Sequence, residues 1–291
     1  MKIERKPPVL DREKVDALIE AAVREDIGGG DVTTELLFET DVECGAAVRS
    51  KQRGILAGLG VAKTVFEKLD KNLAWRSRVK DGDALEAGDE IVFITGSQRH
   101  ILSGERLALN ILQRMSGIAT FTSRFVEAVR GTGVRIMDTR KTAPGLRELE
   151  KYAVRMGGGE NHRFGLYDGI LIKDNHIKLA GGVAGAVSKA RRRAEEAEEN
   201  YVRFPLEVEA KELSQVTEAV AAGADIVMLD NMSAEQMKEA VALAKGKVLL
   251  EASGGVTLEN VREVAETGVD IISVGALTHS APALDISLDM V

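Results

Sequence analysis

The sequence predicts an α/β protein, in which a small, sandwich-like N-terminal α+β domain precedes an incomplete (β/α) barrel with fewer than eight strands. Three observations carry this prediction. β-rich stretches separated by turn signals fill the first part of the chain. Six short apolar stretches then alternate with helical runs, which is typical of parallel βαβ units. Polar side chains follow nearly every one of the six, as in a barrel that places its site at the carboxyl ends of its strands.

The N-terminal domain is expected to span residues 1–114 around a largely antiparallel sheet. Asp11 caps a helix with apolar residues at helical spacing, and the glycines at 28–30 end it. The remaining expected elements are the strands 44–49, 76–79 and 90–94, the turns 80–83 and 86–89, and the helix 60–69.

The barrel domain is expected to span residues 115–280, entered through a helical run at 103–129. Its expected strands are 134–137, 169–172, 204–208, 225–229, 248–250 and 270–274. The helical runs between the later strands are 182–199, 211–222, 234–244 and 258–266, and another helix crosses from 141 to the glycines at 157–159. Since the strand ends of a barrel converge, residues more than 130 positions apart are expected to share one site.

Composition excludes several classes of protein. The chain has 291 residues, 44% of them hydrophobic and 29% charged, with a net charge of −7, which argues against a nucleic-acid-binding protein. No apolar run approaches the ~20 residues of a membrane span, and the N-terminus lacks the apolar core of a secretory signal. The single cysteine, Cys44, is expected to be a small buried strand residue in a protein of the reducing cytoplasm.

Five basic side chains cluster around two of the expected strand ends: Arg140, Lys141, His162, Arg163 and Lys173. Several guanidinium groups that converge suit a dicarboxylate or a diphosphate, because each binds such an anion through two hydrogen bonds. The alternative is that they are solvated or salt-bridged surface cations. We accept that alternative only for Arg147, Lys151 and Arg155, which recur at helical intervals.

Two carboxylates, Glu209 and Asp230, follow apolar strands and should face the same site. Carboxylates there can bind ribose hydroxyls, hold Mg²⁺, or stabilise an oxocarbenium-like transition state. Glu207 lies two residues before Glu209 and points the same way, deeper in the barrel. It is expected to be a buried salt-bridge partner.

Glycine-rich turns after the last two strands predict a phosphate site. Ser253-Gly254-Gly255 follows one of them and Gly275 the other, and free backbone N–H groups in such turns bind phosphate in these barrels. The glycines at 157–159 follow a helix and lack dinucleotide-binding spacing.

The blocks LSGERLALNILQRMSGIAT, DTRKTAPGLRELEKYAVRMGGGENHRFGLYDGILIKDNH, LEVEA, VMLDN, EASGG and VGALTHSAP resemble the quinolinate phosphoribosyltransferase family in this order. The resemblance extends over most of the chain, including EDIGGGDVTTELL near its start. It implies a pentosyltransferase that converts quinolinate and phosphoribosyl pyrophosphate to nicotinate mononucleotide, pyrophosphate and CO₂ with Mg²⁺, for NAD biosynthesis. It also implies a homodimer with shared sites, or a higher oligomer, and a C-terminal tail, 281–291, that packs on the N-terminal domain.

The resemblance also implies roles for particular residues. Those similar to the quinolinate-binding set are Arg106 (reaching the site of the partner subunit), Arg140, His162, Arg163 and Lys173. Those similar to residues around the ribosyl pyrophosphate and its metal are Lys141, Glu209 and Asp230, which we predict to be catalytic, the last two also serving Mg²⁺ directly or indirectly. Those similar to the 5′-phosphate cradle are Ser253, Gly254, Gly255 and Gly275.

Three alternatives stay open at this point. A paralogue of the same fold would act on another aromatic acid or a nucleobase, or serve metal transport. A Schiff-base aldolase would use Lys173 as its amine and would be trapped by borohydride. A non-catalytic binding protein would keep the site without turnover.

Overall fold

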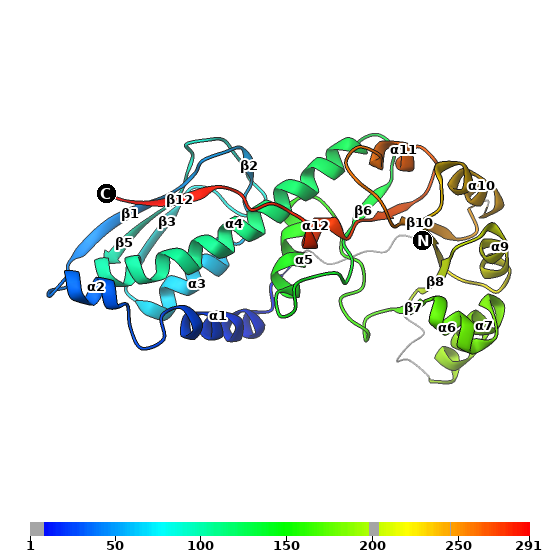
Figure 1. Cartoon of the computed structure of the whole chain (residues 1–291), viewed down its shortest axis with the longest axis horizontal. Helices are drawn as coiled ribbons and strands as arrows, with labels where there is room; N and C mark the ends of the chain where they lie inside the picture. The colour runs from blue at the N-terminus through cyan, green and yellow to red at the C-terminus, as the bar shows by residue number, and fades with distance from the viewer. Residues whose placement is uncertain (1–8, 198–203, 245) are drawn as a thin grey trace. The chain divides into compact units, whose positions relative to one another are not determined.

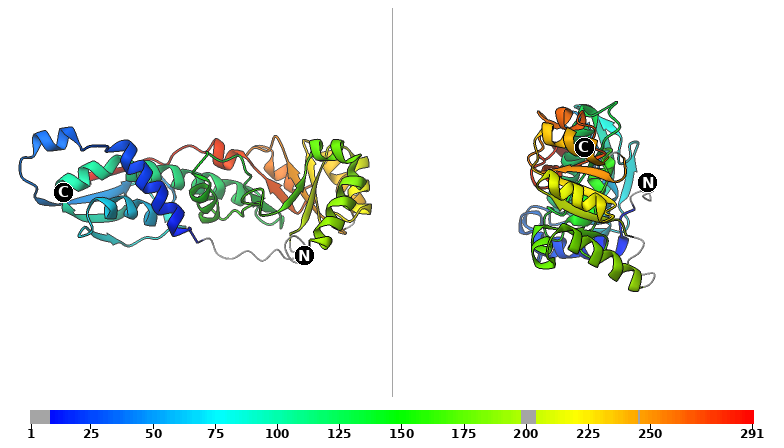
Figure 2. Two further views of the ribbon diagram at one scale, coloured as in Figure 1. Left: turned by 90° about the horizontal axis from the view of Figure 1, so that it is seen from below. Right: turned by 90° about the vertical axis from the view of Figure 1, so that its right-hand side faces the viewer.

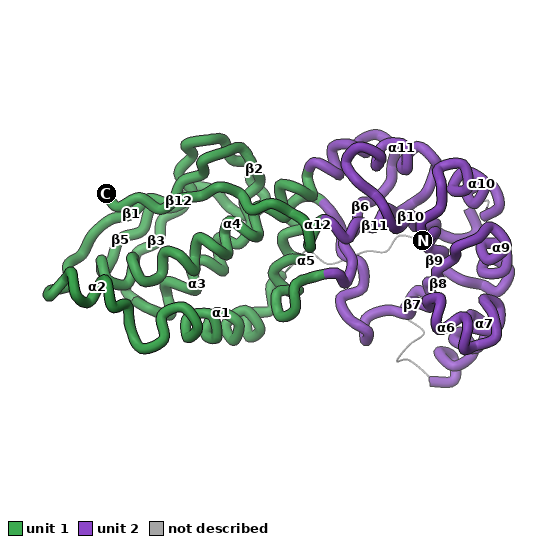
Figure 3. The backbone as a smooth tube through the Cα atoms, viewed as in Figure 1, with its two compact units in different colours: residues 1–123, 142–158, 277–291 green, residues 124–141, 159–276 purple. Residues whose placement is uncertain are grey.

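The structure is a computed structural model that describes residues 9–197, 204–244 and 246–291. The chain divides into two compact units (Figure 3). The first comprises Met1–Ser123, Thr142–Gly158 and Leu277–Val291, and the second comprises Arg124–Lys141 and Gly159–Ala276. The last two residues of the helical run expected at 182–199, and the first eight residues of the chain, lie outside the described part.

The first unit is built on an antiparallel sheet in the order β12-β1-β5-β3 (Figure 1). Its strands are β1 (Glu43–Ser50), β3 (Ala74–Ser77), β5 (Glu90–Ser97) and β12 (Ile286–Met290), with a separate two-stranded pair of β2 (Gly54–Ile55) and β4 (Ala84–Leu85). The C-terminal strand β12 pairs along β1 from Ala46↔Met290 to Ser50↔Ile286. The apolar side chains Ala46, Val48 and Ile94 of these strands are buried.

The first unit also contains six helices or parts of helices among its described residues, and the sequence periodicity predicts the longer ones. They are α1 (Arg12–Asp26), α2 (Val32–Leu37), α3 (Leu59–Leu69), the start of α4 (Gln98–Ala128), α5 (Arg147–Met156) and the end of α12 (Ala276–His279). Asp11 caps α1 as predicted, because its side chain accepts the backbone N–H of Lys14. The long helix α4 begins at Gln98, ahead of the expected 103.

The second unit is a six-stranded parallel sheet, an incomplete barrel, in the order β6-β11-β10-β9-β8-β7. All six strands are the predicted ones: β6 (Arg135–Met137), β7 (Ile170–Ile172), β8 (Leu206–Ala210), β9 (Ile226–Asp230), β10 (Leu249–Ser253) and β11 (Ile271–Ser273). The five residues of β8 are all buried, as expected for a strand covered on both faces.

Helices follow the strands of this sheet. They are α6 (Asp174–Ala180), α7 (Val183–Glu196), α9 (Leu213–Ala221), α10 (Ala234–Ala244) and α11 (Val261–Ala265). In Figures 1 and 2 these helices, green through yellow to orange, line the outer side of the curved sheet. Helices α7 and α9 contact β8, and α10 contacts β10. Because each strand is followed by a helix that packs on the sheet, the loops that connect them lie at the ends of the strands.

One expectation about the surface is wrong. Lys151 of α5 was expected to be a surface cation, but it is only 1% exposed. Helix α5 buries Leu149, Glu150, Lys151, Ala153 and Val154, so its buried side extends around much more than one face. Helical spacing of cations therefore did not mark an exposed stripe here.

The search for membrane-spanning segments covered the helices of the described residues. None of these helices combines the length and the apolar character that a membrane span requires.

Candidate active site

The carboxyl ends of the six parallel strands carry the predicted site residues of the second unit. Arg140 and Lys141 follow β6, Lys173 follows β7, Glu209 lies in β8, Asp230 ends β9, Ser253 ends β10, and Gly275 follows β11. The register pairs Ser253 with Asp230 on one side and with Ser273 on the other, so neighbouring strands end at the same level. Residues from distant parts of the sequence are thereby gathered at one edge of the sheet.

Arg163 and Arg140 lie close enough to repel each other. Burial, followed by the charge of Arg140, lowers the pKa of the Arg163 guanidinium from its ordinary value, while Glu207 and Asp168 act in the opposite direction. The Nη1 group of Arg163 donates to the carbonyl of Gly169 at 3.1 Å. Its buried Nε has no hydrogen-bond partner among the described residues. A bound anion would relieve the repulsion and satisfy this donor.

The segment that carries Arg163 is attached to the edge of β6. Glu160 forms a parallel bridge with Met137, and its N–H donates to the carbonyl of Ile136 at 2.8 Å. Asp138, fully buried at the end of β6, accepts the backbone N–H of His162 at 2.9 Å and the Asn161 side chain at 2.6 Å. These bonds hold the chain at 160–162 rigidly beside the strand end.

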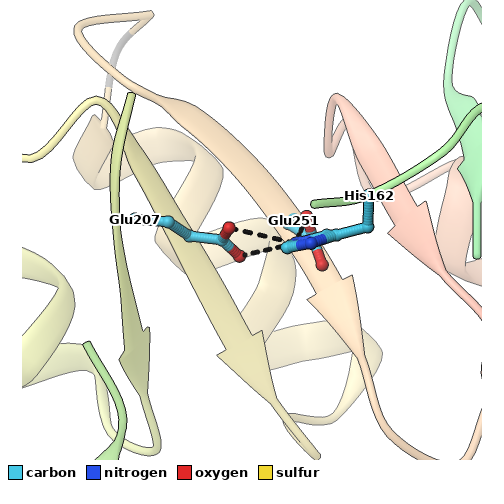
Figure 4. A group of neighbouring side chains, drawn as sticks. All are labelled: His162, Glu207 and Glu251. Carbon is cyan, nitrogen blue, oxygen red and sulfur yellow. Dashed lines mark hydrogen bonds and ion pairs between the residues drawn. The ribbon is translucent and has the colours of Figure 1, made fainter. Parts of the chain in front are cut away.

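The ring of His162 points toward the strands of the sheet, where it meets two buried glutamates (Figure 4). Its Nε2 lies 3.0 Å from Glu207 on β8 and 3.6 Å from Glu251 on β10. Its Nδ1 accepts the backbone N–H of Arg163 at 2.8 Å. Since a nitrogen that accepts carries no proton, the proton of the neutral ring sits on Nε2 and faces the carboxylates.

The cluster bears on the expectations for Glu207 and His162. Glu207 is buried as its position indicated, 5% exposed, and it pairs with His162; with the neutral ring this contact is a hydrogen bond to a carboxylate, and it becomes a salt bridge only when the ring is protonated. Both ring nitrogens of His162 have protein partners, so binding of quinolinate by His162 stays a prediction. The ligand atoms of His162, Glu207 and Glu251 lie within 4.8 Å of one another, a spacing that a cation could use, but here the imidazole N–H lies between the carboxylates.

Glu209 and Asp230 lie near each other with Lys173 beside them. Burial, then the charge of Asp230, raises the pKa of Glu209, and Lys173 partly opposes this. The Nζ atom of Lys173 is 3.9 Å from Glu209. Two carboxylates that disfavour each other's charge at a strand end are suited to a cation or to developing positive charge.

The turn after β10 has the backbone expected of a phosphate cradle. Gly254 and Gly255 have φ of +92° and +63°, values that favour glycine. The Ser253 hydroxyl accepts from Ser273 at 2.9 Å, and the Asn260 side chain donates to the carbonyl of Gly255 at 3.0 Å. Phosphate binding by this turn remains a prediction.

The other predicted residues are placed as follows. The N–H of Lys141 donates to the Thr139 hydroxyl at 3.0 Å, and the Lys141 side chain is exposed. Gly275 directly precedes α12. Arg106 lies on α4 in the first unit, outside the cluster that the second unit forms from its own residues.

Three residues of this cluster received no role from the sequence. Asp138, Glu251 and Asn231 belong to the polar stretches at the ends of the strands, but nothing in the sequence assigned a task to any of them. Asp138 positions the 160–162 segment, Glu251 faces His162, and Asn231 has an unusual backbone with φ of 55°. Their side-chain directions could not be read from spacing alone.

Two consecutive stretches of the sequence match models of one family. Residues 31–116 match the N-terminal domain of quinolinate phosphoribosyl transferase, and residues 118–289 match its C-terminal domain. The two matches together span most of the chain and confirm the resemblance carried by the sequence blocks.

Individual relatives agree with the family models. The chain is 47% identical over 266 residues to a probable nicotinate-nucleotide pyrophosphorylase (carboxylating) of Bacillus subtilis, covering 91% of this chain and 90% of that one. It is 42% identical to the chloroplastic enzyme of that name from Arabidopsis thaliana, covering 97% and 84%. The solved nicotinate-nucleotide pyrophosphorylase of Francisella tularensis superposes with a TM-score of 0.93 at 40% identity, covering 99% and 100%. The chain therefore belongs to the quinolinate phosphoribosyltransferase (decarboxylating) family of pentosyltransferases.

Proposed function

We propose that this protein transfers the phosphoribosyl group of phosphoribosyl pyrophosphate to quinolinate and decarboxylates the product. The products are nicotinate mononucleotide, pyrophosphate and CO₂, on the de novo route to NAD. The observation that carries the proposal is that cations and carboxylates meet at the carboxyl end of one parallel sheet, in a chain of this family.

The cationic side of the site suits quinolinate, which carries carboxylates on two adjacent ring carbons. Arg163 offers a buried Nε donor and lies near Arg140, and Lys173 follows strand β7. A dianion needs more than one cation to offset its desolvation. We assign Arg140, His162, Arg163 and Lys173 to this substrate, with Arg106 supplied by a partner subunit.

The carboxylate side suits the ribosyl pyrophosphate. As pyrophosphate leaves, positive charge develops at the anomeric carbon, and Glu209 and Asp230 provide fixed negative charge. Their oxygens are the hard ligands that Mg²⁺ prefers, and the raised pKa of Glu209 supports this assignment, because a nearby cation would offset the repulsion between the two carboxylates. When bound, Mg²⁺ would neutralise the pyrophosphate oxygens; Lys141 would stabilise the same leaving group, and the turn at 253–255 with Gly275 would hold the 5′-phosphate.

The second step needs less from the protein. Attack of the ring nitrogen on the anomeric carbon breaks the bond to pyrophosphate and leaves the ring cationic. Loss of CO₂ from the carbon next to that nitrogen then leaves its electron pair on the ring, and a proton from solvent replaces the carboxylate. The protein binds and orients both substrates, which accounts for a site made of charges rather than of a covalent nucleophile.

We further propose a homodimer with shared sites that works in the cytoplasm. The proposal of sharing rests on the resemblance of Arg106 in SGERLALN to the arginine that reaches the quinolinate site from a partner subunit. The single cysteine fits a reducing compartment.

A coupled assay tests the function directly. Purified protein would receive quinolinate, phosphoribosyl pyrophosphate and Mg²⁺, and nicotinate mononucleotide and CO₂ would be followed together. We expect both products in equal amounts, and none when nicotinate replaces quinolinate. Product from nicotinate, or none from quinolinate with a folded protein, would contradict the assignment in favour of a paralogue with another acceptor. Trapping by borohydride would instead indicate an aldolase.

Two substitutions test the assigned roles. Lys141→Ala and Asp230→Ala should each lower kcat by about 10² or more, the usual effect of removing one electrostatic contribution to a transition state. The melting temperature should change little, because neither side chain is buried in the core. Lys189→Ala, at an exposed position of α7, is the matched control. Wild-type turnover in either variant would remove that residue from the mechanism.

A further inference from the structure

We propose that Asn231 is a positioning residue that fixes the Asp230 carboxylate and connects it to the turn at Ser253-Gly254-Gly255. The inference rests on the function proposed above and deepens it. In this proposal Asn231 connects the part of the site that binds the ribose to the part that binds the phosphate.

The backbone of Asn231 is the first observation. Its φ of 55° is the one left-handed value of a non-glycine residue in the described part of the chain. Such a conformation is strained for residues with a Cβ, and asparagine tolerates it better than most. Glycine would adopt it without strain. If this position only had to adopt a left-handed φ, glycine would be favoured over asparagine. The presence of asparagine therefore indicates that its carboxamide contributes an interaction.

The contacts of Asn231 show what that task is. The Nδ2 group donates to Oδ1 of Asp230 at 2.9 Å. The backbone N–H donates to the carbonyl of Ser253 at 2.9 Å, just beyond the point where Ser253 and Asp230 pair in the sheet. One residue thus bonds both to the carboxylate that ends β9 and to the residue that ends β10. The bond to Oδ1 leaves Oδ2 as the oxygen through which Asp230 can act on the ribosyl substrate.

The space opposite Asn231 is the second, independent observation. A Cβ added to Gly254 would lie 2.3 Å from Asn231 Oδ1, 2.6 Å from its Cγ and 2.8 Å from its Nδ2. Any side chain at 254 would therefore displace the carboxamide and break its bond to Asp230. The glycine of the turn and the asparagine after β9 fit each other as a pair.

The main test is Asn231→Gly, which keeps the backbone conformation and removes the carboxamide. The KM for phosphoribosyl pyrophosphate, and its Kd by calorimetry with and without quinolinate, should rise about tenfold, the effect of one hydrogen bond to a charged group. The KM for quinolinate should stay within about twofold. The melting temperature should equal or exceed that of the wild type, because strain is relieved.

A merely structural role for Asn231 predicts a different pattern. The melting temperature would fall and both substrates would be affected together. That pattern, or an unchanged affinity for phosphoribosyl pyrophosphate, would overturn the inference. The matched control is Asn72→Gly, at an exposed turn position of the first unit, which should leave both KM values unchanged.

Two more variants test the donor and the link to the turn. Asn231→Asp keeps the size and the tolerance of a left-handed φ but cannot donate, so it should lose at least as much affinity as Asn231→Gly; wild-type affinity would contradict the donor role. Gly254→Ala should cost less in the Asn231→Gly background than in the wild type, because the collision is then absent. Additive losses would contradict the link.

The calorimetry separates failure of this inference from failure of the function. A wild-type protein that binds no phosphoribosyl pyrophosphate would overturn both. A wild-type protein that turns over quinolinate, and binds phosphoribosyl pyrophosphate no better than Asn231→Gly does, would overturn the inference alone.

Discussion

The Glu209 side chain shows how a residue that lowers the stability of the folded protein can serve its function. It lies at the end of a strand whose residues are all buried, and burial followed by the nearby Asp230 charge raises its pKa. A carboxylate whose charge is disfavoured by its surroundings is one that a cationic ligand or transition state stabilises. The charged Glu209 therefore lowers the stability of the folded chain in return for a site that favours positive charge.

The variant Glu209→Gln should separate these two effects. Below the ordinary pKa of glutamic acid the group is neutral in both the folded and the unfolded chain, so the two proteins should be about equally stable. Between that ordinary pKa and the raised folded-state pKa the wild type loses stability and the variant does not, and above the raised pKa the difference stays constant. Thermal unfolding without metal from pH 4 to 8 should therefore show a melting temperature of the variant that first increasingly exceeds that of the wild type and then exceeds it by a constant amount.

Activity should change in the opposite sense, with kcat/KM for Glu209→Gln lower by about 10². Glu218→Gln, at an exposed position of α9, is the control and should leave both stability and activity unchanged. A variant less stable than the wild type at neutral pH would show that Glu209 is held by favourable contacts and would contradict the reasoning from burial.

At the residue scale, the sequence located side chains but not their partners. Lys173, Glu209 and Asp230 were found because polar residues after apolar strands must lie at one edge of the sheet, and Arg163 was found because its loop lies between two such strand ends. The pairing of His162 with Glu207, 45 residues away, was not found, because it depends on a loop conformation and a ring direction that spacing does not encode.

Helix α4 shows at the element scale how one glycine decides packing. Gly117 lies inside this helix, where glycine is normally unfavourable, yet a Cβ there would lie 2.1 Å from the carbonyl oxygen of Pro282. The segment after Pro282 passes directly over the helix, and the N–H of Leu284 donates to the carbonyl of Gln113. That segment leads into β12, whose Ile286 is buried beside β1.

We expect Gly117→Ala to destabilise the protein, although alanine has a higher helix propensity than glycine. Propensity alone would add about 1 kcal/mol of stability, but the collision with Pro282 backbone should outweigh it by about 1–3 kcal/mol. The control is Gly60→Ala in α3, where no heavy atom lies within 4 Å of the new Cβ and a gain of up to about 1 kcal/mol is expected. Denaturant unfolding of both variants gives the signs, and a stabilised Gly117→Ala would show that the 282–284 segment packs elsewhere.

Elements with a regular apolar pattern were predictable and those without one were not. All six strands of the second unit and the helices α1, α3, α4, α7, α9, α10 and α11 followed from periodicity and alternation, although some of them are very short. The helices α2 and α6 were not expected, because α2 buries only Thr34 and α6 buries none of its residues, so neither shows an apolar period. Lys151 was misplaced because its helical spacing does not show that the polar side of α5, including Glu150, is itself covered in the fold.

At the scale of the whole molecule, the six-strand order leaves β6 and β7 unpaired with each other, and the segment around Glu160 bonds to the open edge of β6. A closed barrel would have had no such edge. The opening is what brings His162 and Arg163 to the strand ends, so the incomplete barrel and the cationic side of the site are one feature. The number of strands was readable from the sequence, but the use of the open edge was not.

Sharing of sites between subunits can be tested by mixing two inactive proteins, Arg106→Ala and Asp230→Ala. If Arg106 acts in the partner's site, a hybrid dimer contains one site with neither substitution. Random assembly from equal amounts should then restore about a quarter of wild-type activity, since half of the dimers are hybrids and half of their sites are intact. Hybrids isolated through two different affinity tags should reach about half.

The control mixture is Lys141→Ala with Asp230→Ala, two substitutions in the second unit of the same chain. Every site built from one chain's second unit then carries one of the two changes, so hybrid dimers should stay inactive. Activity restored by the control but not by the Arg106 mixture would reverse the assignment. It would mean that strand ends of two chains form each site and that Arg106 serves its own subunit.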